Sequence, residues 1–131
     1  MTSSFKLTAL EIDGGAGPLS SPFELELDFI LTRPSADLSF SLSYLVDGML
    51  KRHVVPLLTT DPTPYSEGAN SLLLSVSSVD VSNVEPGRLA NAGLLSIDVL
   101  EGGEEVCTIN CVVMVREVGG EFEREIYSPF E

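Results

Sequence analysis

Pro22-Phe23-Glu24-Leu25-Glu26-Leu27-Asp28-Phe29 is the stretch of this sequence that decides the fold. From 23 to 31 every second residue is apolar, and acidic residues fill the gaps as far as Phe29. A period of two indicates a β-strand with one face on a core and one in water. After a turn around Pro34 the same period returns over 38–46. We therefore expect these two strands to form an antiparallel pair that begins a β-sandwich.

Length and charge narrow the class of protein. The chain has 131 residues, so we expect a single domain over 1–131. Acidic residues outnumber basic ones 20 to 7, which gives a net charge of −13 at pH 7. Such a surface attracts basic partners and repels nucleic acid and anionic lipid, so neither direct nucleic-acid binding nor membrane binding is expected. No apolar run approaches the roughly 18 residues that span a membrane.

The two cysteines and the first residues indicate an intracellular protein. Cys107 and Cys111 lie four apart in an expected strand, hence about 13 Å apart, too far for a disulfide. We expect free, buried thiols in a reducing compartment. The opening residues lack the basic start and apolar run of a signal peptide.

The rest of the chain also has β patterning. Apolar parity slips once between Ala9 and Leu10, which predicts a β-bulge, and Pro56 predicts an edge position or a bulge. We expect a loop over 59–70, no regular pattern over 77–92 apart from a turn at 85–87, and hairpin turns at 47–48, 102–103 and 119–120. The fold class is all-β, an immunoglobulin-like β-sandwich of about seven or more antiparallel strands, over 5–12, 23–31, 38–46, 49–58, 71–76, 93–100, 106–115 and 121–127.

Signatures of catalysis are weak. His53 and the two strand cysteines are too few for a metal site of three or four convergent ligands. There is no Gly-x-Ser-x-Gly elbow, and the glycines of 14–17 lead into Pro18 rather than into a phosphate-binding helix. Neighbouring carboxylates such as Glu104 and Glu105 are interpreted as solvated charge. We expect no enzyme activity, no metal and no cofactor.

Several segments resemble the anti-silencing function histone chaperones, whose opening has a valine-rich strand, Asn-Pro-Phe-x-Phe-Glu-Ile-x-Phe-Glu, then Asp-Leu-Glu-Trp and Tyr-Val. Here the corresponding segments are Leu10-Glu11-Ile12-Asp13, the stretch 21–29, Asp37-Leu38-Ser39-Phe40 and Ser43-Tyr44-Leu45, followed by weaker matches at 61–64, 67–68 and 86–87.

The resemblance implies an immunoglobulin-like sandwich, nuclear and able to shuttle to the cytoplasm, that binds the histone-three/histone-four dimer during nucleosome assembly and disassembly. In the family a concave sheet face with an apolar centre and an acidic rim covers a histone helix. A separate groove docks partner chaperones. Carried over, that groove would involve Asp37, Leu38, Thr59, Thr60 and Leu72.

The histone-binding face departs from the family pattern at two positions. Arg52 stands where the family has an acidic residue, and Thr108 stands where it has the arginine of a Gly-x-Glu-Phe-x-Arg hairpin; the alternative placement of that hairpin at 119–124 requires an inserted hairpin. The family core also continues for a few strands beyond 131. With the first placement, the face would involve Leu45, Asp47, Arg52, Leu95, Ile97, Thr108, Asn110 and Val112.

Three functional hypotheses follow. The first is a divergent histone-chaperone-like binding module. The second is an immunoglobulin-like interaction domain without histone binding, which adds a peptide strand at an open edge beside 121–127. The third is a small lipid carrier or hydrolase, which requires an internal cavity or a convergent polar cluster.

Overall fold

The computed structural model describes residues 5–47, 52–80 and 92–129, and within these ranges the protein is all-β. None of the described residues form a helix that is long and apolar enough to cross a membrane. The expected turns at 47–48 and 85–87 lie wholly or partly outside the described residues. The strands are β1 (Phe5–Asp13), β2 (Gly17–Pro18), β3 (Phe23–Leu31), β4 (Ser35–Asp47), β5 (Arg52–Thr59), β6 (Thr63–Tyr65), β7 (Gly68–Val76), β8 (Ala92–Glu101), β9 (Glu104–Val118) and β10 (Glu121–Tyr127).

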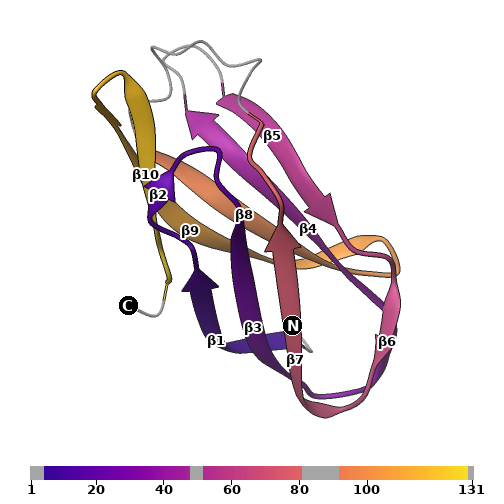
Figure 1. Cartoon of the computed structure of the whole chain (residues 1–131). Coiled ribbons are helices and arrows are strands. Elements are labelled where there is room, and N and C mark those ends of the chain that lie inside the picture. The colour runs from indigo at the N-terminus through magenta and orange to yellow at the C-terminus, as the bar shows by residue number, and fades with distance from the viewer. Residues whose placement is uncertain (1–4, 48–51, 81–91, 130–131) are drawn as a thin grey trace.

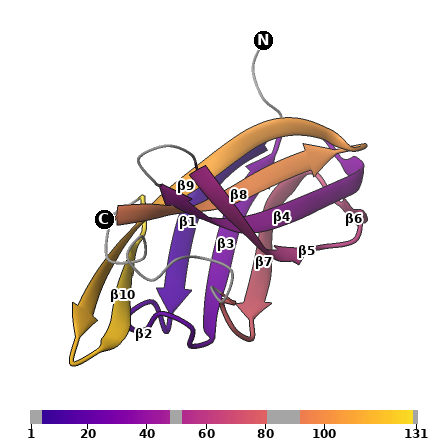
Figure 2. The ribbon, with the colours of Figure 1, turned by 90° about the horizontal axis from the view of Figure 1, so that it is seen from above.

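Two antiparallel sheets form the sandwich. The small sheet has the order β1-β3-β7, and the large sheet has the order β2-β10-β9-β8-β4-β5, with β6 pairing on β4. Figures 1 and 2 show the small sheet as one layer and β9, β8 and β4 as the layer packed against it. The orders β1-β3-β7 and β9-β8-β4-β5 match strands A-B-E and G-F-C-C′ of immunoglobulin-like domains. The expected fold class is therefore confirmed.

The expected pairing of the two strands that decide the fold is wrong. β3 pairs with β1 and β7, whereas β4 pairs with β5, β6 and β8. The two strands instead face each other across the core, where the rings of Phe29 and Phe40 lie 5.8 Å apart. Alternation shows which face of a strand is apolar, but two such faces bury each other equally well across a sandwich.

The core between the sheets is built by the alternating residues. Leu25, Leu27 and Phe29 of β3 are fully buried, and so are Ile97 and Val99 of β8. Aromatic rings close one end of the core, where the Phe5 and Phe29 rings stack with centroids 4.9 Å apart. The parity of each strand thus decides which side chains remain available to a partner.

Local irregularities follow the sequence signals closely. The expected bulge in β1 is present, but its register shift lies between Leu7 and Ala9, slightly before the parity slip at Ala9 and Leu10. Pro56 lies on β5, an edge strand with a register shift opposite it, between Leu42 and Ser43. The loop expected over 59–70 is partly wrong, because β6 occupies 63–65 and β7 begins at Gly68. The turns at 102–103 and 119–120 are present, with all four glycines at positive φ.

Candidate functional site

The outer face of the large sheet carries a row of apolar side chains that crosses five strands. The register aligns Leu45 with Val54 on one side and with Leu94 on the other, then Leu94 with Val112, and Val112 with Tyr127. We call Val54, Leu45, Leu94, Val112 and Tyr127 the apolar row.

The apolar row is accessible to a partner. Val54 is 52% exposed, Val112 46% and Tyr127 40%, while Leu45 and Leu94 are half-buried. Met114, also exposed, follows Val112 on the same face of β9. Large apolar side chains that are exposed together on adjacent strands mark an interaction surface more often than single exposed ones do.

Polar and acidic groups flank the apolar row on both sides. Toward the 102–103 turn, Ser43, Ser96 and Asn110 form the next register row. Beyond them, the Thr108 hydroxyl donates a hydrogen bond to the Asp98 carboxylate at 2.9 Å and also contacts the Glu105 carboxylate.

On the other side of the apolar row the charges are mixed. Glu125 is aligned with Met114, and further along the Arg116 guanidinium and the Glu123 carboxylate form an exposed ion pair at 3.7 Å. The outer face therefore has an apolar centre with carboxylates on both flanks.

Part of the face that the resemblance implies lies on this surface. Leu45, Thr108, Asn110 and Val112 are on the outer face of the large sheet. Asp47 and Arg52 are aligned with each other at the end of the β4–β5 hairpin, but their side chains lie outside the described structure.

Two of the predicted face residues point the other way. Leu95 and Ile97 are 1% and 0% exposed and belong to the core. Their neighbours Leu94 and Ser96 occupy the outer face instead. On β8 the parity that is apolar throughout is the buried one. The apolar residue Leu94 on the other, mostly polar parity is therefore the residue that indicates an apolar outer face.

The predicted docking groove is dispersed. Asp37 is exposed beside the 102–103 turn, where its carbonyl accepts a hydrogen bond from the Gly102 amide at 3.1 Å. Leu38 is buried in the core. Thr59 and Thr60 lie beside β4, where the Phe40 amide donates to the Thr60 hydroxyl at 2.9 Å. Leu72 belongs to β7 in the other sheet and is half-buried against the core.

The edge beside 121–127 is occupied by the chain itself. The Leu19 amide donates to the Phe122 carbonyl at 2.9 Å, and the Ile126 amide donates to the Gly15 carbonyl at 3.2 Å. Strand addition at β10, as the second hypothesis has it, would have to displace these hydrogen bonds.

Arg124 holds that covering loop in place. Its guanidinium is almost fully buried and donates hydrogen bonds to the carbonyls of Leu19 at 2.6 Å, Ser21 at 2.9 Å and Gly14 at 3.0 Å. The carbon atom of the guanidinium also lies 4.8 Å from the centre of the Phe23 ring. Burial lowers the pKa of Arg124, while the Tyr44 hydroxyl acts in the opposite direction.

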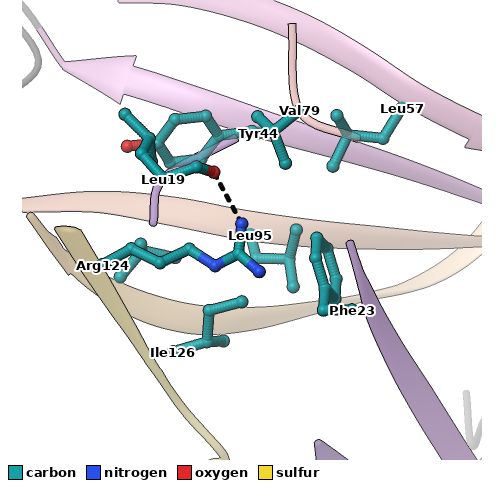
Figure 3. A pocket seen from close by; sticks show the side chains of 9 residues that line it. Leu19, Phe23, Tyr44, Leu57, Val79, Leu95, Arg124 and Ile126 are labelled. Atoms are coloured by element: carbon teal, nitrogen blue, oxygen red, sulfur yellow. Dashed lines mark hydrogen bonds between the residues drawn. The ribbon is translucent and has the colours of Figure 1, made fainter. Parts of the chain in front are cut away.

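The interior beside Arg124 is closely packed. Figure 3 shows Leu19, Phe23, Tyr44 and Ile126 around the guanidinium. The cavity that they line measures about 10 Å³, which is room for about one water molecule. A lipid does not fit there, so this cavity gives the third hypothesis no support.

Metal chemistry finds no support in the described ranges either. Within 5–47, 52–80 and 92–129, no three histidine, cysteine, aspartate or glutamate side chains lie close enough together to hold a metal ion. Cys107 and Cys111 are free thiols, but only Cys111 is buried as expected, whereas Cys107 is half-buried. Burial raises the pKa of Cys111 to about 11, so this thiol is inert near neutral pH.

Comparisons with known proteins bear on the fold alone. No protein-family model matches this sequence, and no curated protein matches it. Among solved structures, the chain is similar to the alkylpurine DNA glycosylase AlkC of Pseudomonas fluorescens, solved bound to DNA containing an abasic site analogue. The TM-score is 0.51 at 14% identity, over 82% of this chain and 30% of that one, so the chain spans less than a third of that protein's length.

Proposed function

We propose that this protein is a non-enzymatic interaction module that covers an amphipathic, basic segment of a partner protein with the outer face of its large sheet. The observation that carries the proposal is the apolar row, five aligned residues with carboxylates on both flanks. The net charge of −13 favours encounter with basic partners.

The dimensions of the apolar row suit a helix. Adjacent strands lie about 4.8 Å apart, so five strands place the ends of the row about 19 Å from each other. An α-helix rises 1.5 Å per residue, so about 13 residues would lie along the row. The apolar stripe of such a helix would rest on Leu45, Leu94 and Val112, and its basic side chains would reach Asp98 and Glu125.

The partner that we propose is the histone-three/histone-four dimer, and the setting is the nucleus. Support comes from the resemblance to the anti-silencing function histone chaperones and from the match of an acidic, apolar-centred sheet face to a basic helix. Arg52, the first residue of β5, argues for altered affinity, since it is basic and the corresponding residue of that family is acidic.

Binding to purified histone-three/histone-four dimer tests the proposal. We expect a complex on gel filtration and heat in calorimetry at low salt, both weakened as salt rises. Val112→Lys places a positive charge within the apolar row and should abolish the complex. Leu73→Lys makes the same change on the small sheet, at a side chain that is 57% exposed, and should leave histone binding intact.

Two results would reject the proposal. One is the absence of any complex with the folded wild-type protein. The other is an equal effect of the two lysine variants, which would show that binding follows net charge and not the apolar row.

A further inference from the structure

β7 is an end strand of the small sheet. Its inner side pairs with β3 over the whole strand, from Gly68 aligned with Leu31 to Val76 aligned with Phe23. Within the described residues, no strand pairs with its outer side. Figure 1 shows β7 as the last strand of the front layer. As far as the described residues extend, the main-chain groups along its outer side are therefore open to another chain.

Of the other three end strands of the described sheets, β2 is only two residues long, and β1 and β5 carry features that discourage pairing. β1 has a bulge between Leu7 and Ala9 and a charged residue at Lys6. β5 has Pro56, which donates no hydrogen bond, and a register shift opposite it. β7 has neither bulge nor proline, and all nine of its residues are uncharged. Natural edge strands usually carry such protection, so its absence from β7 indicates an edge that is used.

The outer face beside this edge is acidic. Glu24, Glu26 and Asp28 of β3 are aligned with Ser75, Leu73 and Ser71 of β7. The Ser71 hydroxyl donates to the Asp28 carboxylate at 2.6 Å, and the Ser75 hydroxyl donates to the Glu24 carboxylate at 2.9 Å. Serine side chains are short, so lysine or arginine side chains on an added strand can reach past them to these carboxylates.

The same edge offers apolar contacts. Leu73 is the most exposed of the large apolar side chains in the described ranges. The surface hollow of about 270 Å³ that it lines lies toward β1 and β3, where Glu11, Glu24 and Glu26 are its acidic lining. On the core side of β7, Leu72 is half-buried. On its outer side an added strand would therefore meet carboxylates and the side chain of Leu73. On its inner side it would meet the apolar side chain of Leu72.

We propose that β7 takes up an extended partner segment of alternating basic and apolar residues as a fourth strand of the small sheet. Main-chain hydrogen bonds would supply affinity, and the alternating side chains would supply specificity. A second copy of this chain is the less favourable occupant. Pairing β7 with β7 would join two acidic faces that each belong to a chain of net charge −13. This surface is separate from the apolar row, which lies on the opposite sheet.

A synthetic peptide of nine alternating lysine and valine residues, matched in length to β7, tests the proposal. We expect saturable binding by fluorescence anisotropy, weakened by salt, and slower amide hydrogen exchange in β7 of the bound protein. Replacing every lysine of the peptide by glutamate, or a valine next to its middle residue by proline, should remove the binding. Protection of β1 or β5 in place of β7 would overturn the proposal.

Two variants separate this surface from the apolar row. Leu73→Lys should weaken peptide binding about tenfold, because it adds a like charge beside the peptide and removes an apolar contact. Val54→Lys makes the same change at a side chain of similar exposure on β5 and should leave peptide binding unchanged. Equal weakening by both variants would contradict the proposal. A wild-type dimer in sedimentation that Leu73→Lys dissolves would also overturn it, since the occupant would then be a second copy.

Discussion

At the scale of single residues, Arg124 joins parts of the chain that are distant in sequence. Its guanidinium hydrogen bonds end on the backbone carbonyls of the 14–22 loop, and its side-chain stem comes from β10. Arginine can satisfy several carbonyls at once because its donors form a rigid planar fork. Replacing it with an apolar side chain would leave those carbonyls buried without donors.

Arg124→Met should therefore lower the free energy of unfolding by about 3 kcal/mol, measured by chemical denaturation. The matched control is Arg116→Met, which removes an exposed arginine whose ion pair with Glu123 should contribute less than about 1 kcal/mol. If the two variants lost equal stability, the buried hydrogen bonds of Arg124 would not have the role assigned to them.

Cys111 should make the free energy of unfolding depend on pH in the alkaline range. Its pKa is raised by burial to about 11, so its stabilising contribution is complete below the ordinary thiol pKa of about 8.5 and is lost as the pH rises toward 11. Chemical denaturation of the wild-type protein between these pH values should show a falling free energy of unfolding. Cys111→Ala should show a shallower fall. Identical slopes would contradict the burial of this thiol.

At the scale of elements, strand parity was more predictable than strand partners. Alternation in the sequence located the eight longer strands and identified the buried parity of β3 and β9. It did not show that β3 and β4 belong to different sheets, because that choice depends on the order in which strands pack. Nor did the family resemblance place Leu95 and Ile97 correctly, since a shift of one residue moves a side chain to the other face.

The apolar row was only partly predictable, for the same physical reason. Leu45 stands out as an apolar residue on the otherwise polar parity of its strand. Val112 stands out less, because Met114 and Val118 are apolar on the same parity of its strand. Val54 and Tyr127 give no such signal, because β5 is apolar on both parities and Tyr127 ends a strand. Their alignment with Leu94 depends on the register across five strands, which no local pattern contains.

The β4–β8 pairing depends on a close approach at Gly93. A Cβ atom added there would lie 2.8 Å from the Leu45 carbonyl oxygen, which is backbone and cannot rotate away. Gly93→Ala should lower the free energy of unfolding by about 2 kcal/mol through overpacking, measured by thermal or chemical denaturation. Gly103→Ala provides the comparison, because a Cβ atom there has open space and its strain comes from a φ of +85° alone. That strain should amount to about 1 kcal/mol. A neutral Gly93→Ala variant would contradict the tight β4–β8 approach.

At the scale of the whole molecule, net charge opposes the compact state. A charge of −13 on 131 residues repels itself, and salt screens that repulsion. Adding sodium chloride at pH 7 should therefore raise the midpoint of thermal unfolding. Near pH 4.2, where the net charge of the sequence vanishes, the gain should largely disappear. A midpoint that falls with salt at pH 7 would show that specific ion pairs outweigh the general repulsion.

The two proposed surfaces both suit basic ligands, but they differ in the conformation of the ligand that each takes. The apolar row on the large sheet suits a helix, whereas the free edge of β7 on the small sheet suits an extended strand. Because they lie on opposite layers in Figure 2, both can be occupied at once. We therefore expect binding of the lysine-valine peptide to leave binding of the histone dimer unchanged.

Amide chemical-shift mapping by NMR, during titration with the histone-three/histone-four dimer at low salt, would locate the surface that the dimer covers. We expect the largest changes at Val54, Leu45, Leu94 and Val112, with smaller changes toward the small sheet. Changes confined to β1, β3 and β7, or no changes at saturating dimer, would contradict this expectation.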